Sequence, residues 1–255
     1  YSNDGNISAV LGVREDYIPN YGLRFTPRIH LRYQPWEKLT LRFSSGTGFR
    51  RPNVFIENVS QMASSKEFVF MGKLPNLDSA KSIGGSALYT FRLFKRNASI
   101  NMDYFYTSFN TKYYLDFYKD SSKNYFYSLP SNSYSKVLQI EADVEPIKNL
   151  SLKIAYKFND VNSNSHHNTY VPYSKLLVSS GYTSRIKKWN MDATAMRIGR
   201  MQIPFEANST AYWIFHAQYT RNFRLASVYI GSENLTNYTQ KNPIIDAENP
   251  FSKTF

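Results

Sequence analysis

Arginine side chains recur at a regular spacing near the start of the chain. The spaced residues are Arg24, Arg28 and Arg32, with His30 between the last two, and Arg42 follows in the next candidate element. A spacing of four fits one face of a helix or of a strand, but Pro27 within the run argues against a helix. Guanidinium groups on one strand face pair with carboxylates through charge-assisted hydrogen bonds, so the predicted chemistry is the binding of anionic groups.

A second cluster is aromatic and lies in the connection 109–132. Its members are Tyr113, Tyr114, Phe117, Tyr118, Tyr125, Phe126 and Tyr127. Aromatic platforms stack on sugars and on hydrophobic ligands, so we predict ligand contacts here. An equal alternative is that these residues extend the two flanking strands and form an aromatic girdle. The connection 46–78, with Phe55, Phe68, Phe70 and Met71, is a second candidate for ligand contacts.

Metal and catalytic chemistry have little support in the sequence. His166 and His167 could bind haem iron or another metal, but neighbouring histidines on a strand point oppositely and no third ligand has suitable spacing. There is no cysteine, no nucleophile elbow and no phosphate-binding glycine loop. We therefore predict no catalytic residue, no metal site, no cofactor and no enzymatic activity.

The elements that must position these residues show a period of two. In residues 149–159, Leu150, Leu152, Ile154, Tyr156 and Phe158 alternate with polar or small residues that include Lys153 and Lys157. Such alternation is typical of a strand between an apolar and a polar medium. We predict eleven strands and no amphipathic helix, with the strands at 6–14, 23–33, 39–45, 80–92, 98–107, 137–144, 149–159, 172–183, 189–198, 209–219 and 223–232.

Composition favours one large unit in contact with a membrane. The 255 residues contain no linker, and 21 Tyr and 18 Phe supply much of the apolar content, as in the aromatic girdles of membrane barrels. A soluble sandwich would share the alternation. The chain has no run of 18 apolar residues that would form a spanning helix. Its net charge of +12 is scattered over turns and polar strand faces, so we predict a positively charged lumen and no nucleic-acid partner.

Connection lengths also indicate a barrel. From residue 34 onward, short connectors alternate with long ones at 46–78, 109–132, 160–171, 199–208 and from 233 to the end. Outer-membrane barrels have short periplasmic turns and long extracellular loops. Eleven is an odd number, and two unpaired edges are intolerable in lipid, so we expect these strands to form part of a larger barrel.

Three segments resemble motifs of TonB-dependent outer-membrane receptors. Residues 45–53, SGTGFRRPN, resemble the family's G-x-G-F-R-x-P strand-to-loop segment, and residues 21–28, YGLRFTPR, resemble its GL-x-x-TPR strand start. Residues 231–238, GSENLTNY, are similar to its G-x-x-NL-x-N-x segment near the C-terminus, and residues 240–251 look like the version found in Bacteroidetes receptors. The resemblance covers essentially the whole chain.

The resemblance implies an all-β, antiparallel up-and-down transmembrane barrel of about 22 strands in the outer membrane, of which residues 1–255 are the C-terminal half. It implies an active importer of a scarce nutrient such as a siderophore, haem, cobalamin or glycan. The expected partners are membrane lipid, the rest of the barrel, a plug domain outside this chain, and the TonB complex acting through the missing N-terminal part. Arg24, Arg28, Arg32 and Arg42 would then face the lumen and dock the plug, or alternatively line an anion-conducting wall. A passive porin and an envelope assembly or adhesion barrel are the other functions considered.

Overall fold

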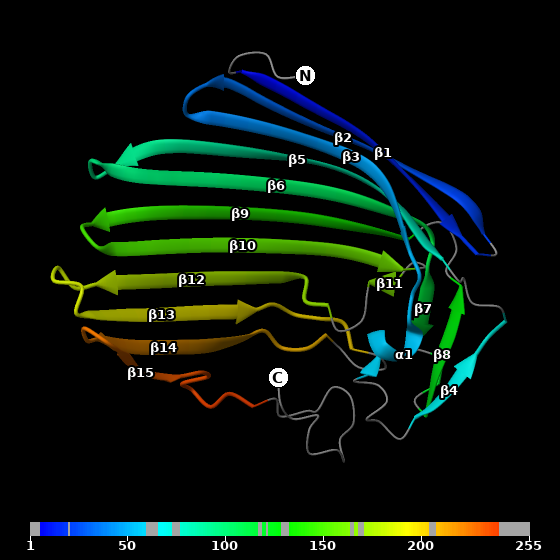
Figure 1. Cartoon of the computed structure of the whole chain (residues 1–255). Helices are drawn as coiled ribbons and strands as arrows, with labels where there is room; N and C mark the ends of the chain where they lie inside the picture. Colours follow the sequence, from blue (N-terminus) through cyan, green and yellow to red (C-terminus); the bar gives the residue numbers. More distant parts are fainter. Residues whose placement is uncertain are drawn as a thin grey trace.

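The computed structural model describes residues 6–19, 21–59, 66–72, 77–116, 119–120, 122–128, 133–163, 166–167, 171–203 and 208–239. An antiparallel meander of eleven strands forms the large sheet (Figure 1). Its strands, in spatial order, are β1 (Ile7–Ile18), β2 (Gly22–Trp36), β3 (Leu39–Arg50), β5 (Asp78–Leu93), β6 (Arg96–Thr111), β9 (Ser133–Ile147), β10 (Leu150–Ser163), β12 (Ser174–Thr183), β13 (Trp189–Ile198), β14 (Tyr212–Asn222) and β15 (Ser227–Ser232). The two-residue strand β11 (His166–His167) pairs with β10. The predicted fold class and the eleven strands are confirmed.

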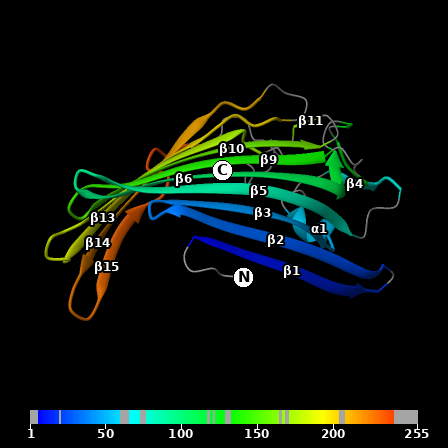
Figure 2. The same ribbon diagram turned by 90° about the horizontal axis from the view of Figure 1, so that it is seen from above.

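The large sheet is curved into an open trough (Figure 2). One face carries exposed apolar side chains on nearly every strand, among them Leu31, Phe43, Ile83, Ile100, Ile140, Ile154, Val178 and Phe215. Grooves lined by polar and charged side chains lie on the other face, which is therefore the concave, lumenal side. Since the two sets alternate along each strand, the register of the paired strands keeps each set on one face of the sheet.

Aromatic side chains lie on the apolar face near both ends of the strands. Tyr182, Trp189 and Tyr219 form a row at the end with short turns, with ring centroids 5.3 Å and 6.3 Å apart. Trp213 and Phe215 stack at 5.9 Å toward the opposite end. Amphipathic rings favour the boundary between lipid and water, so these rows mark the two boundaries of the apolar band.

The short turns are tighter than the sequence indicates. Phe94 and Lys95 both have positive φ, as a two-residue hairpin of type I′ requires, and Asn149 has φ of 69°. The strands accordingly continue into the predicted connectors, so that β9 runs on to Ile147. At the predicted turn 220–222, β14 instead continues to Asn222, and Phe223 donates to the carbonyl of Ala226 to close the turn.

Two of the predicted long loops contain a second, smaller sheet. The strands β4 (Glu67–Phe70), β8 (Lys123–Ser128) and β7 (Tyr113–Asp116) form it in that order, next to the short helix α1 (Val54–Glu57). The prediction missed these elements because runs such as EFVF and YYLD are too short to show a period. Figures 1 and 2 place this sheet and α1, together called the cap, at the end of the large sheet where the long connections lie. Among the described residues, no helix has the length and apolar character to cross a membrane.

Candidate functional site

The four spaced arginines lie on the lumenal face of β2 and β3. The alternation of β2 places Arg24, Arg28 and Arg32 on one face, opposite to Leu23 and Phe25. The register sets Arg32 directly across from Arg42 of β3. Like charges directly opposite one another are destabilising unless an anionic group lies nearby.

A groove of about 550 Å³ lies above this arginine pair. Arg32, Arg42 and His30 line it together with Asp103 and Phe105 of β6. Asp103 accepts a hydrogen bond of 2.5 Å from the Asn101 amide, and Arg32 donates to the neutral side chain of Gln34. Arg24, Arg28 and Arg42 have no hydrogen bond or ion pair within the described part of the chain. The groove is therefore positively charged and suited to carboxylates.

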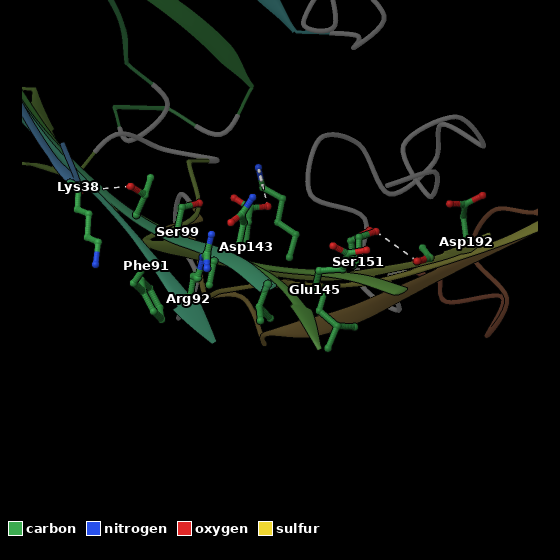
Figure 3. A pocket seen from close by; sticks show the side chains of 16 residues that line it. Lys38, Phe91, Arg92, Ser99, Asp143, Glu145, Ser151 and Asp192 are labelled. Atoms are coloured by element: carbon green, nitrogen blue, oxygen red, sulfur yellow. Dashed lines mark hydrogen bonds and ion pairs between the residues drawn. The ribbon is translucent and has the colours of Figure 1, made fainter. Parts of the chain in front are cut away.

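A larger hollow of about 910 Å³ occupies the lumenal face closer to the short turns (Figure 3). Ser99, Asp143 and Asp192 point into it from β6, β9 and β13, whereas Phe91 points to the other side of the sheet. Lys153 pairs with Glu141 at 2.9 Å and reaches Asp143 at 4.0 Å. The hollow is lined by both basic side chains (Lys38, Arg92 and Lys153) and acidic ones (Asp143, Glu145 and Asp192). The wall near the short turns therefore carries mixed charge, whereas the lumenal side chains of β2 and β3 are mainly basic.

The cap divides the aromatic cluster between two faces. Tyr113 and Phe126 lie in the cap core with Leu115, packed against Val54 of α1 and Phe68 of β4. Phe126 is 0% exposed, and its ring lies 5.2 Å from that of Phe70. Tyr113 and Tyr114 begin the cap strand β7 and do not extend β6. An aromatic girdle would require these residues to continue the flanking strands of the large sheet.

Three tyrosines of the cluster lie on the opposite face of the cap. The cross-strand pairing of β7 and β8 places Tyr114 beside Tyr127, with ring centroids 5.3 Å apart, and Tyr125 beside Asp116. The Tyr127 hydroxyl donates to Asp116 at 3.1 Å, and the Lys119 ammonium lies 4.5 Å from the Tyr125 ring. This tyrosine face (Tyr114, Tyr125 and Tyr127) offers rings, hydroxyls and a cation to a ligand, although Tyr114 itself is only 6% exposed. Phe117 and Tyr118 lie outside the described residues.

A polar latch joins the cap to the rim of the large sheet. Arg50 at the end of β3 donates to Asp78 of β5 at 3.0 Å and to Glu57 of α1 at 2.9 Å. Glu57 also accepts from the Tyr113 hydroxyl at 2.7 Å, and Asp78 accepts from the Tyr113 backbone amide at 3.2 Å. Arg50 lies on the same face of β3 as Arg42, because side chains alternate along the strand, and it pairs in register with Asp78 of β5. Both side chains therefore lie on the lumenal face. The contact with Glu57 therefore holds α1 on the lumenal side of the rim.

The latch has a defined ionisation state. Burial raises the pKa of the Glu57 carboxyl, but hydrogen bonds from Tyr113 and the Asn53 amide and the charge of Arg50 lower it more, so the pKa lies below its ordinary value. Burial, followed by the hydrogen bond to Glu57, raises the pKa of Tyr113 to about 12. At neutral pH the latch therefore contains a carboxylate and a neutral phenol.

Sequence patterns did not indicate this latch, because Glu57 and Tyr113 are 56 residues apart and share no period. Only the Asn53 cap of α1, which accepts from the Ile56 amide at 3.1 Å, is a local signal. His166 and His167 form β11, whose side chains lie outside the described set. The described residues contain no group of three potential metal ligands.

Comparison with known proteins identifies the family. The model of the family described as "TonB dependent receptor-like, beta-barrel" matches residues 1–247. The chain belongs to this family. TonB-dependent receptors are outer-membrane barrels that act in transport, which agrees with the two-faced strands and the sorted connections of this chain. No curated protein sequence matches the chain at a significant level.

Solved structures of TonB-dependent receptors have the same fold. A ferric enterobactin receptor mutant from Pseudomonas aeruginosa, in complex with enterobactin, superposes with a TM-score of 0.71 at 13% identity, over 97% of this chain and 40% of its own. The siderophore receptor PirA from Acinetobacter baumannii gives 0.69 at 9% identity, over 96% and 41%. The FrpB iron transporter from Neisseria meningitidis gives 0.61 at 10% identity, over 86% and 36%. This chain thus spans about two fifths of the length of these receptors.

Proposed function

We propose that this chain forms one wall of an active outer-membrane importer of a scarce nutrient such as a siderophore, haem, cobalamin or glycan. The observation that carries the proposal is the latched cap. Two long connections fold together and are held on the lumenal side of the rim by Arg50, Glu57 and Tyr113. A largely pre-formed surface is typical of a site that selects a ligand, so the ordered cap supports an importer.

Within this proposal the tyrosine face of the cap contacts the nutrient. Its rings can stack on planar or sugar groups, and Lys119 and Lys123 supply positive charge nearby. Tyr113 and Phe126 then support that face from the cap core. Because the similar solved structures include siderophore receptors, iron siderophores come first among the nutrients to test.

The lumenal arginines are proposed to dock a plug domain, through which the TonB complex would supply energy. Arg24, Arg28, Arg32 and Arg42 are available for carboxylates of such a domain, since none is paired with a carboxylate in the described part of the chain. The plug and the TonB contact would belong to parts of the protein beyond this wall.

Uptake in a deletion strain tests the proposal. Complementation with the full-length protein should restore growth on one of the four nutrients supplied as a limiting source, and a proton uncoupler should abolish that uptake. Tyr125→Ala with Tyr127→Ala should raise the nutrient concentration needed for half-maximal uptake, whereas Tyr156→Ala on the apolar face should not. Uptake that survives the uncoupler and rises linearly with concentration would refute the importer and identify a passive pore.

A further inference from the structure

Two lysines lie on the apolar, lipid-facing side of the large sheet. Lys81 of β5 is two residues from Ile83, and Lys136 of β9 is four residues from Ile140, both exposed apolar side chains of that face. Because side chains alternate along a strand, both lysines point to the lipid side. Both lie near the strand ends that carry the long connections, which are extracellular in outer-membrane barrels. Lipid cannot solvate a charged side chain, so each lysine calls for a partner.

Hydroxyl groups lie between the two lysines. In register, Ser108 of β6 is opposite both Lys81 and Tyr134, and Tyr106 is opposite Lys136. The Tyr106 and Tyr134 rings stack with centroids 6.1 Å apart, and the Lys136 ammonium lies 4.5 Å from the centroid of the Tyr134 ring. The backbones at the two lysines are two strand spacings apart, about 10 Å across the sheet. We call these five residues, Lys81, Tyr106, Ser108, Tyr134 and Lys136, the lysine–tyrosine patch.

Most hydrogen-bond donors of the patch are unused within the protein. In the part of the chain that the structure describes, Lys81 is exposed without an ion pair, and the three hydroxyls have no hydrogen bond. Lys136 lies opposite Asp160 of β10, with 3.7 Å between its ammonium and the carboxylate. Ion pairs that are partly exposed, as this one is, are weak. The patch therefore keeps a positive charge and several free donors.

A lone arginine on the same face provides the contrast. Arg197 of β13 also lies near the long connections, but its neighbours in register are Leu176 and Trp213. A single basic side chain beside a tryptophan is typical of a residue that extends to the membrane interface. The lysine–tyrosine patch differs, because two cations and three hydroxyls lie together in one area.

We infer that the lysine–tyrosine patch binds the phosphate of a phosphorylated glycolipid in the outer leaflet of the membrane. The two ammonium groups neutralise the phosphate, and the hydroxyls donate hydrogen bonds to its oxygens. The position selects a lipid among anions, because a phosphate at the edge of the apolar band can remain bound while its acyl chains pack on the apolar face below. This site lies on the lipid side of the barrel, so it does not depend on the proposed nutrient or on a plug.

Lipid binding by the full-length protein in detergent tests the inference, with native mass spectrometry as the measurement. The natural protein should bind the phosphorylated glycolipid of the host outer membrane more tightly than the same lipid after phosphatase treatment. Lys81→Gln should weaken binding of the phosphorylated lipid about fivefold, the factor expected for one basic residue near an anionic membrane surface. Lys81→Arg should retain the binding. Heat-modifiable migration in gels verifies that each variant has a folded barrel.

Two further variants have different expected results. Asp160→Asn should strengthen binding of the phosphorylated lipid, because it removes the carboxylate that competes for Lys136. Arg197→Gln is the matched control and should leave binding unchanged, since it removes a charge of the same face outside the patch.

Three outcomes would overturn the inference. Equal binding of the lipid before and after phosphatase treatment would mean that the patch does not recognise phosphate. Equal losses in Lys81→Gln and Arg197→Gln would assign the effect to the general charge of the lipid face. Displacement of the glycolipid by inorganic phosphate would identify a free anion as the ligand. None of these outcomes affects the proposed importer, because nutrient uptake by Lys81→Gln should equal that of the natural protein.

Discussion

At the scale of single residues, Glu57 determines whether the cap is held to the rim. Its carboxylate receives hydrogen bonds from Arg50, Tyr113 and the Asn53 amide. Glu57→Gln keeps the shape but removes the charge, and hydrogen bonds to a charged group contribute about 1.5–3 kcal/mol each. We expect faster hydrogen exchange in β7 and β4, while the exchange of β10 stays unchanged.

The exposed pair of Glu67 with Lys123, at 2.9 Å, provides the control for that substitution. Glu67→Gln should leave the hydrogen exchange of the cap nearly unchanged, since solvent screens exposed ion pairs. Equal exchange in Glu57→Gln and Glu67→Gln would show that the latch does not hold the cap.

The pKa of Tyr113 predicts how the latch responds to alkali. A phenol whose pKa is raised from about 10 in the unfolded chain to about 12 stabilises the cap fully below pH 10. This contribution is lost as the pH rises through about 12. Limited proteolysis of the cap should therefore accelerate between pH 10 and 12 in the natural protein. In Tyr113→Phe, whose ring cannot ionise, cleavage should be faster at neutral pH and lack this step.

The lowered pKa of the Glu57 carboxyl predicts how the stability of the latch changes in acid. Its pKa is lowered, so its contribution is present above the unfolded value of about 4.3 and is lost as the pH falls through the folded value. Cap proteolysis should thus accelerate in acid for the natural protein, and Glu57→Gln should show no such acceleration.

At the scale of elements, strand β8 contains a weak point in the cap core. Asn124 is 0% exposed, and neither of its amide atoms has a hydrogen-bond partner in the described structure. A buried unpaired polar group costs about 1–3 kcal/mol, so Asn124→Leu should slow hydrogen exchange in the cap. Asn58→Leu is the matched control, because the Asn58 amide is paired: it donates to the Val54 carbonyl and to the Tyr113 hydroxyl. Loss of these two hydrogen bonds should speed hydrogen exchange in the cap. Slower exchange in both variants would contradict this assignment.

Close packing also joins β5 to β6. A Cβ at Gly84 would lie 2.2 Å from the Phe105 ring, so Gly84→Ala should destabilise the barrel by about 1–3 kcal/mol through overpacking. Gly85→Ala, whose Cβ would have its nearest neighbour at 3.4 Å, should change the unfolding free energy little. Urea unfolding in vesicles measures both, and equal costs would show that Phe105 moves away freely.

At the scale of the whole molecule, the lipid and lumenal faces impose opposite demands on neighbouring residues of β10. Ile154 is 49% exposed on the apolar face, and Ala155 lies next to it on the lumenal face. Ile154→Lys should cost about 2–4 kcal/mol, as charges facing lipid near the bilayer midplane do. Ala155→Lys should be tolerated. The amount of heat-modifiable barrel in the outer membrane reports both, and equal loss would contradict the assignment of the faces.

Much of this molecule could be predicted from its sequence, because a strand between lipid and lumen must alternate. The alternation at 149–159 and its counterparts gave all eleven strands of the large sheet, and the four arginines were expected on one face for the same reason. Turn ends were less predictable, since φ at residues such as Phe94 and Lys95 is decided by closure of the hairpin rather than by residue type.

What only the tertiary structure decided is the architecture over the lumen. The sequence shows seven aromatic residues in one connection, but it cannot show that Tyr113 and Phe126 fill the cap core while Tyr125 and Tyr127 lie on its other face. Strand β8 pairs with β4, more than 50 residues earlier in the chain, and this pairing determines the two faces. The latch is equally non-local, because it depends on register between strands and on contacts between distant segments, which no local period records.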